Sequence, residues 1–166
     1  MKSLILALTL FSMTVCFSQA TELHLSNSVV MDLNLPKEAS HSNNLLILKF
    51  DDWYFSHEVI DPKTFFSPVD LTDIQHDFVK SVFYPNLRGN FPNWLGELAN
   101  EQAISLGLPK SKVIDRKFHN FELVGNYDSI SKQGYIFILE EYQIHHISYF
   151  GEITNYINMI DTIKGK

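Results

Sequence analysis

Histidine is the side chain in this sequence with the widest chemical potential, because it can transfer protons near neutral pH or bind a metal ion. The seven histidines are His24, His41, His57, His76, His119, His145 and His146. A zinc site needs three or four converging ligands, which often include two histidines four residues apart on one helix. No two histidines have that spacing, and neighbours on the strand predicted for 144–150 point to opposite faces. We therefore predict neither a metal site nor a cofactor.

His57 alternates with apolar residues along a predicted strand, on which it shares a face with Trp53, Phe55 and Val59. The pattern leaves two interpretations open. A half-buried imidazole could titrate near pH 6.5 under the influence of Glu58, or it could lie at the core edge with a backbone carbonyl as its partner. The second is the more common arrangement, and His57 is retained as a candidate binding residue.

Two pairs of neighbouring carboxylates, at 51–52 and 140–141, are the other groups that could perform acid–base chemistry. Glycoside hydrolysis needs two carboxyl groups that face each other across a cleft, whereas neighbours along one strand diverge. Both pairs are predicted to be solvated residues at bends or turns. The sequence also has no Gly-x-Ser-x-Gly motif, phosphate-binding loop or dinucleotide-binding fingerprint, so no catalytic residue is predicted.

Aromatic residues are numerous, with thirteen Phe, seven Tyr and two Trp, and several fall in segments that are predicted to be loops. The candidate binding residues among them are Phe65, Phe66, Phe91 and Trp94. Aromatic side chains on loops are typical of binding hot spots. The alternative is that these rings fold back over the sheet and cover the core.

The first twenty residues have the pattern of a secretory signal peptide. Lys2 precedes an apolar run at 4–11, and Ser18 and Ala20 provide small residues for cleavage after position 20. We expect a bacterial periplasmic or secreted protein without a stable membrane span. Lipidation at Cys16 is the less favoured alternative, because Val15 stands where a lipoprotein signal has a small residue.

The rest of the chain, 21–166, is predicted to form a single α+β domain. We expect a mostly antiparallel sheet, two central helices and a C-terminal amphipathic helix that packs on the sheet. The expected strands are 31–35, 45–60, 113–124, 135–139 and 144–150. A polar turn at 37–44 joins the first two strands as a hairpin, and a second polar turn at 125–133 follows the third strand. The expected helices run from Thr72 to about Val82, from Asn93 to Leu106, and over 152–163.

Two short segments resemble the Mog1/PsbP-like fold family. They are the first strand with its proline, Met31-Asp32-Leu33-Asn34-Leu35-Pro36, and the end of the last helix, Ile157-Asn158-Met159-Ile160-Asp161-Thr162-Ile163-Lys164. The resemblance has no residue-level match over 61–110. It implies a binding or assembly module, and it transfers no catalytic residue because the family is functionally mixed.

The net charge of −6 argues against a nucleic-acid partner, because such a partner requires a basic face. The sequence therefore predicts an exported, non-enzymatic module that binds another protein, with a small apolar ligand as the less favoured occupant. An accessory subunit or an immunity protein that neutralises a basic toxin would suit the acidic charge. The competing prediction is a periplasmic hydrolase or metal-dependent enzyme that uses His57, His119 and nearby carboxylates.

Overall fold

The computed structural model describes residues 21–166, so the expected leader and Cys16 lie outside the described residues. This part of the chain forms one compact domain of two antiparallel sheets and several helices, which confirms the α+β prediction. The strands are β1 (Thr21–His24), β2 (Val29–Leu33), β3 (Glu38–Ser42), β4 (Leu45–Lys49), β5 (Tyr54–Val59), β6 (Lys112–Lys117), β7 (Phe121–Asp128), β8 (Gln133–Glu140), β9 (Ile144–Phe150) and β10 (Ile163–Gly165). The α-helices are α1 (Gln75–Phe83), α2 (Asn93–Ser105) and α3 (Ile153–Asp161), and the 3₁₀ helices are η1 (Pro85–Asn90) and η2 (Leu108–Lys110). None of the helices in residues 21–166 is long and apolar enough to cross a membrane.

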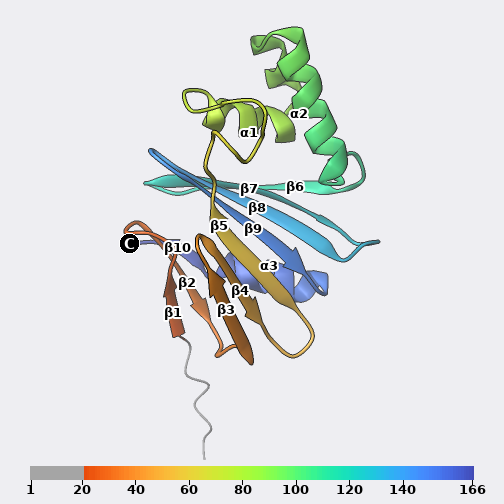
Figure 1. The fold of residues 1–166 in the computed structure, drawn as a ribbon. Coiled ribbons are helices and arrows are strands. Elements are labelled where there is room, and N and C mark those ends of the chain that lie inside the picture. Colours follow the sequence, from red (N-terminus) through yellow and green to blue (C-terminus); the bar gives the residue numbers. More distant parts are fainter. Residues whose placement is uncertain (1–20) are drawn as a thin grey trace, which may run out of the picture.

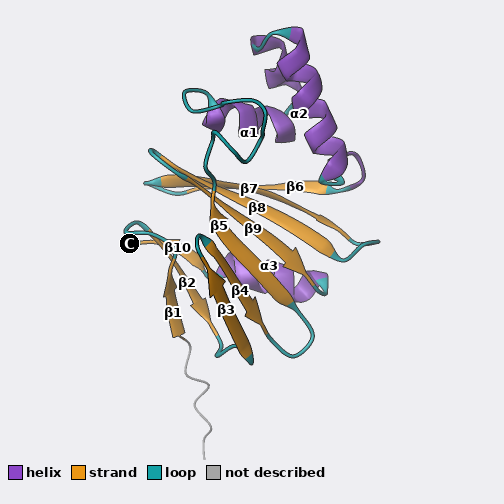
Figure 2. Cartoon of the chain, in the orientation of Figure 1, coloured by secondary structure: helices purple, strands orange, loops and turns teal. Residues whose placement is uncertain are grey.

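The larger sheet separates two layers of the molecule. Its seven strands follow the order β3-β4-β5-β9-β8-β7-β6, and every neighbouring pair is antiparallel. Helices α1 and α2 lie on one face, whereas α3 and the small sheet β1-β2-β10 lie on the other (Figure 1). The large sheet thus lies between the helical layer of α1 and α2 and a second layer that contains helix α3 and the small sheet (Figure 2).

Each face of the large sheet has its own hydrophobic core. Strand β8 shows the division, because Ile136 and Ile138 pack toward α3 and the small sheet, whereas Phe137 and Leu139 pack toward α1 and α2. Successive side chains of a strand point to opposite faces, so a strand buried on both faces becomes a continuous apolar run. This explains why 134–150 is so rich in apolar residues.

The small sheet brings the two ends of the described chain together. Strand β2 lies between β1 and β10, with Met31 opposite both Leu23 and Ile163. Met31 is fully buried in the first core, beneath α3. The structure thereby corrects the predicted hairpin, because the segment at 31–35 does not pair with the one at 45–60.

The two segments around that expected hairpin also differ from the prediction. The polar stretch at 37–44 contains the exposed edge strand β3, whose backbone pairs with β4. The long strand expected at 45–60 is two strands, because the Phe50 N–H donates to the Trp53 carbonyl and closes a turn around the 51–52 carboxylates. The Phe50 and Trp53 rings stack across this turn, with centroids 3.9 Å apart.

The strand expected at 113–124 is likewise a hairpin of β6 and β7. The turn between them is closed by a hydrogen bond from the Phe118 N–H to the Phe121 carbonyl. Gly125, which was expected to begin a turn, continues β7 instead. A Cβ at this position would lie 2.6 Å from the Tyr135 carbonyl oxygen and 3.0 Å from the Tyr156 hydroxyl, so glycine permits α3 to approach the sheet closely.

The three predicted helices are present, including the C-terminal helix that packs on the sheet. Helix α2 begins at Asn93 as expected, and the chain turns after it through Gly107, whose φ of 74° is left-handed. Helix α1 begins three residues later than predicted. The Thr72 hydroxyl bonds to the Asp70 carboxylate, 2.5 Å away, and does not cap the helix.

Candidate functional site

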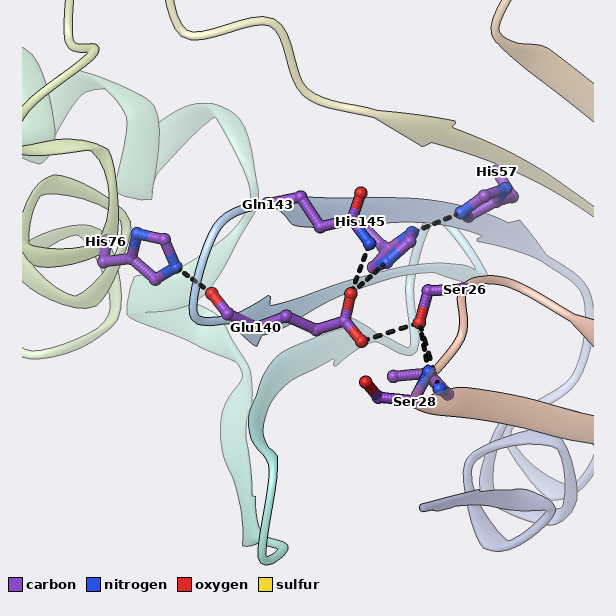
Figure 3. A network of polar contacts seen from close by, with 8 residues as sticks. Ser26, Ser28, His57, His76, Glu140, Gln143 and His145 are labelled. Carbon is purple, nitrogen blue, oxygen red and sulfur yellow. Dashed lines mark hydrogen bonds and ion pairs between the residues drawn. The ribbon is translucent and has the colours of Figure 1, made fainter. Parts of the chain in front are cut away.

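Four polar side chains form a hydrogen-bonded chain at the edge of the first core (Figure 3). The Ser26 hydroxyl lies 2.6 Å from Glu140 Oε1, and Glu140 Oε2 lies 3.2 Å from His145 Nε2. His145 Nδ1 in turn lies 2.9 Å from His57 Nε2. These four residues are called the histidine–glutamate network below.

Sheet register brings the network together from distant parts of the sequence. Val59 lies opposite His145 in the pairing of β5 with β9, so His57 is its diagonal neighbour on the same face. The two imidazole rings are stacked, with centroids 5.1 Å apart. Glu140 ends β8 one step beyond the last pair with β9, and Ser26 comes from the turn between β1 and β2.

The protonation of the network follows from its burial and its donors. Burial disfavours the charged form of Glu140, but hydrogen bonds from Ser26, Gln143 and His145 outweigh it and hold the pKa of this carboxyl below its usual range. Burial lowers the pKa of His145, and burial together with the neighbouring His145 lowers the pKa of His57 to about 4. Glu140 is therefore ionised at pH 7, and both imidazoles are neutral.

These charges assign the ring tautomers. Only a protonated Nε2 of His145 can donate to the Glu140 carboxylate, which leaves its Nδ1 to accept a hydrogen bond from the His57 Nε2–H. All donors in the network then point toward Glu140. A proton on His145 Nδ1 would reverse the bond between the two rings, because Nδ1 would then donate to the Nε2 of a His57 that carries its own proton on Nδ1.

The network has few groups left for catalysis. The Ser26 hydroxyl donates to Glu140 and also accepts the backbone N–H groups of Ser28 and Val29, each at 3.0 Å. A nucleophilic serine needs a base that can take its proton, and here the base is a carboxylate that already accepts three hydrogen bonds. The network therefore serves as a clamp that holds the β1–β2 turn against the ends of β8 and β9.

The structure corrects three predictions about these residues. Glu140 is 7% exposed, not a solvated turn residue, whereas Glu141 next to it is exposed. His57 is buried, and its partner is a histidine ring, not a backbone carbonyl. His76, expected on a solvated face, bonds through Nε2 to the carbonyl oxygen of Glu140.

Sequence reasoning missed Ser26, Glu140 and His145 as members of one site. His145 carried a signal, because it alternates with the inward-facing Ile147 and Tyr149. The opposite orientations of His145 and His146 are confirmed, since the second ring bonds to Glu58 on the other face. No local pattern marks Ser26, whose role depends on a contact across 114 residues.

A cleft of about 680 Å³ borders the network and is called the network cleft. His76, His119, Glu122 and Glu141 contribute to its walls. Within residues 21–166, no three His, Cys, Asp or Glu side chains are placed to hold one metal ion. His57 does not line the network cleft, so His57 and His119 do not share one site there.

The four candidate aromatic residues lie in two separate places. Phe66 is 8% exposed and packs in the second core against Phe78, and Phe65 covers it and the His146 ring. Phe91 and Trp94 instead line a groove between α1, η1 and α2. Phe66 is therefore a core residue, whereas Trp94 is 55% exposed.

The groove at Trp94 has a volume of about 560 Å³ and is called the Trp94 groove. Its walls are mostly apolar, with the carboxylates of Asp70 and Asp77 at its side. The residues that line it are Val69, Asp70, Leu71, Ile74, Asp77, Leu87, Asn90, Phe91, Pro92, Trp94 and Leu95.

No protein-family model, curated protein or solved structure matches this chain. The resemblance to the Mog1/PsbP-like family stays a prediction. The features of the molecule that bear on its function are therefore the polar network with its cleft and the Trp94 groove.

Proposed function

We propose that this protein is an exported, non-enzymatic module that binds another protein through the Trp94 groove. The observation that carries the proposal is the exposure of Trp94 beside a concave, largely apolar surface. Tryptophan is the residue most enriched in binding hot spots, and hot spots pair with pockets that exclude water. An accessory subunit or a toxin-neutralising immunity protein would need such a surface.

Hydrolysis is supported less well than binding. The serine and carboxylate of the histidine–glutamate network are occupied by each other and by backbone groups. The two imidazoles lie inside the core edge, where they support the fold. The Trp94 groove, in contrast, presents a large exposed side chain that does not support the fold in the way the two imidazoles do.

Export is the part of the proposal that rests on the leader pattern. Protein purified from the source organism is expected to begin at Thr21 and to occur in an extracytoplasmic fraction, because Ser18 and Ala20 form a cleavage signal. N-terminal sequencing measures this directly. Recovery of a cytosolic protein that retains Met1 would contradict export. It would not affect the binding proposal, which has its own test.

Partner binding is tested by placing a photo-crosslinking amino acid at position 90 in the source organism, because Asn90 is exposed and lines the Trp94 groove, and Trp94 itself stays in place. The expected result is one discrete protein adduct that is missing when the crosslinker stands at Ile130, an exposed residue in the turn after β7. The partner identified in this way should bind the purified protein about 30-fold more weakly after Trp94→Ala, the loss typical of a hot-spot tryptophan. Equal binding of the partner to the unsubstituted protein and to Trp94→Ala, or the lack of an adduct at position 90, contradicts the proposal.

A further inference from the structure

Three adjoining cavities surround the N-terminal end of α1. The Trp94 groove and a middle cavity of about 540 Å³ share Ile74 and Asp77 in their walls. The middle cavity and the network cleft share His76 and the turn at 141–143. The surface is therefore hollowed continuously from Trp94, past the start of α1, to the turn between β8 and β9. This continuous depression is called the α1 groove.

The α1 groove carries an excess of negative charge. Asp73, Asp77 and Glu141 line it, and none of the three forms an ion pair within residues 21–166. Among the lining residues of the described chain, Lys80 is the one lysine or arginine, and its ammonium lies 2.9 Å from Glu122 Oε2. An occupant that complements this surface electrostatically therefore carries positively charged groups.

The middle of the α1 groove also holds an unused hydrogen-bond acceptor. The side-chain oxygen Oε1 of Gln75 is buried and has no hydrogen-bond partner in the described part of the chain. Gln75 lines the middle cavity. A buried acceptor without a donor raises the free energy of the folded state, and a turn of the Gln75 side chain toward the middle cavity would let an N–H group of an occupant relieve that cost.

Exposed aromatic side chains stand at two points along the α1 groove. Trp94 borders one end, and Tyr142, which is 84% exposed, belongs to the turn that the middle cavity and the network cleft share. Carboxylates lie between them. The order along the surface is thus aromatic, acidic and aromatic, which an extended chain with alternating side chains can match.

We infer that the α1 groove binds an extended segment of a partner protein that contains lysine or arginine between apolar residues. The inference deepens the proposed function and rests on it. The basic side chains meet Asp73, Asp77 and Glu141, an N–H group of the segment bonds to Gln75 Oε1, and an apolar residue packs on Trp94. A folded partner that presents only a flat surface would leave the middle cavity empty.

The inference is tested with random twelve-residue peptides displayed on phage and selected on the purified protein. Selected peptides are expected to combine lysine or arginine with aromatic or large aliphatic residues. A synthetic copy of the best peptide should lose affinity about tenfold at low salt when Asp73→Asn and Asp77→Asn are combined, and the loss should shrink as salt is added. The matched control is Glu101→Gln, which neutralises an exposed carboxylate of α2 outside the α1 groove and should leave the affinity unchanged.

The outcomes separate this inference from the function on which it rests. Selection of acidic or uncharged peptides overturns the inference, as does peptide binding that falls after Trp94→Ala but not after the aspartate substitutions. In both cases a partner crosslinked at position 90 would still support the proposed function. Failure to select any peptide also overturns the inference, and the crosslinking result then decides the proposed function alone.

Discussion

Phe66→Ala is expected to lower the free energy of unfolding by about 3–5 kcal/mol, because it leaves a cavity in the second core. The Phe66 ring packs edge-on against Phe78 and beneath Phe65, so its removal takes contacts from several side chains at once. Trp94→Ala should change the free energy of unfolding by less than about 1 kcal/mol, since an exposed side chain contributes little to the fold. Thermal unfolding of both variants beside the unsubstituted protein measures the difference.

For a domain of this size, the loss at Phe66 corresponds to a fall in melting temperature of roughly 10 °C. Ile104→Ala is a suitable control, because this residue is exposed on α2 outside the Trp94 groove. A melting temperature for Trp94→Ala that falls as far as that for Phe66→Ala would make Trp94 a structural residue. Such a result would remove the observation on which the binding proposal depends.

Acidification from pH 7 to pH 5 is expected to lower the free energy of unfolding by about 2 kcal/mol through His57 alone. The pKa of His57 falls from 6.5 to about 4 on folding, so the unfolded chain binds more protons throughout that range. The contribution of the neutral His57 to stability is complete above pH 6.5 and is lost as the pH falls toward 4. The total loss of unfolding free energy between pH 7 and pH 4 is about 3 kcal/mol. His145 adds a loss of the same sign, because burial also lowers its pKa.

Urea unfolding at pH 7, 6 and 5 measures this dependence above the range in which carboxyl groups titrate. His57→Gln should flatten the curve of stability against pH, whereas the control His119→Gln, at an exposed histidine, should keep its slope. The titratable groups near His57 are Glu58 on the same strand, β5, and His145 and His146 on the neighbouring strand β9. A slope unchanged by His57→Gln would show that the buried pair does not control the acid stability.

Local patterns in the sequence predicted the helices better than the strand pairing. The stripe of Ile153, Tyr156, Ile157, Ile160 and Ile163 predicted α3, because helical periodicity is a property of consecutive residues. Its last member was assigned wrongly, since α3 ends at Asp161 and Ile163 begins β10. Pairing between β2 and β10 joins the two ends of the chain, and nothing near residue 31 indicates it. The breaks at 50–53 and 118–120 are marked only by the short polar pairs Asp51-Asp52 and His119-Asn120, and neither turn contains the glycine or proline that usually signals a break.

The candidate site residues could likewise be predicted where their position depends on neighbouring residues in the sequence, and not where it depends on distant contacts. Phe91 and Trp94 fall in a short segment beside a proline, so their place at the edge of a helical layer could be inferred locally. Phe66 has the same local pattern, but the arrangement of α1 above it places the ring in the core. Glu140 was assigned to solvent because a carboxylate at a turn is normally exposed, and its burial depends on donors from two separate segments, the turn at Ser26 and the stretch 143–145.

The pairing of β2 with β10 means that the native fold cannot be completed before β10 has been synthesised. A polypeptide that emerges with its N-terminus first presents β2 early, whereas Ile163, the partner of Met31, follows more than a hundred residues later. Strand β2 therefore remains without its second neighbour until β10 has been synthesised, and closing so long a loop then carries an entropic cost. Under the proposed export, a chain that has not yet acquired β10 cannot reach its native topology, so it would still be unfolded when it enters a translocation pore.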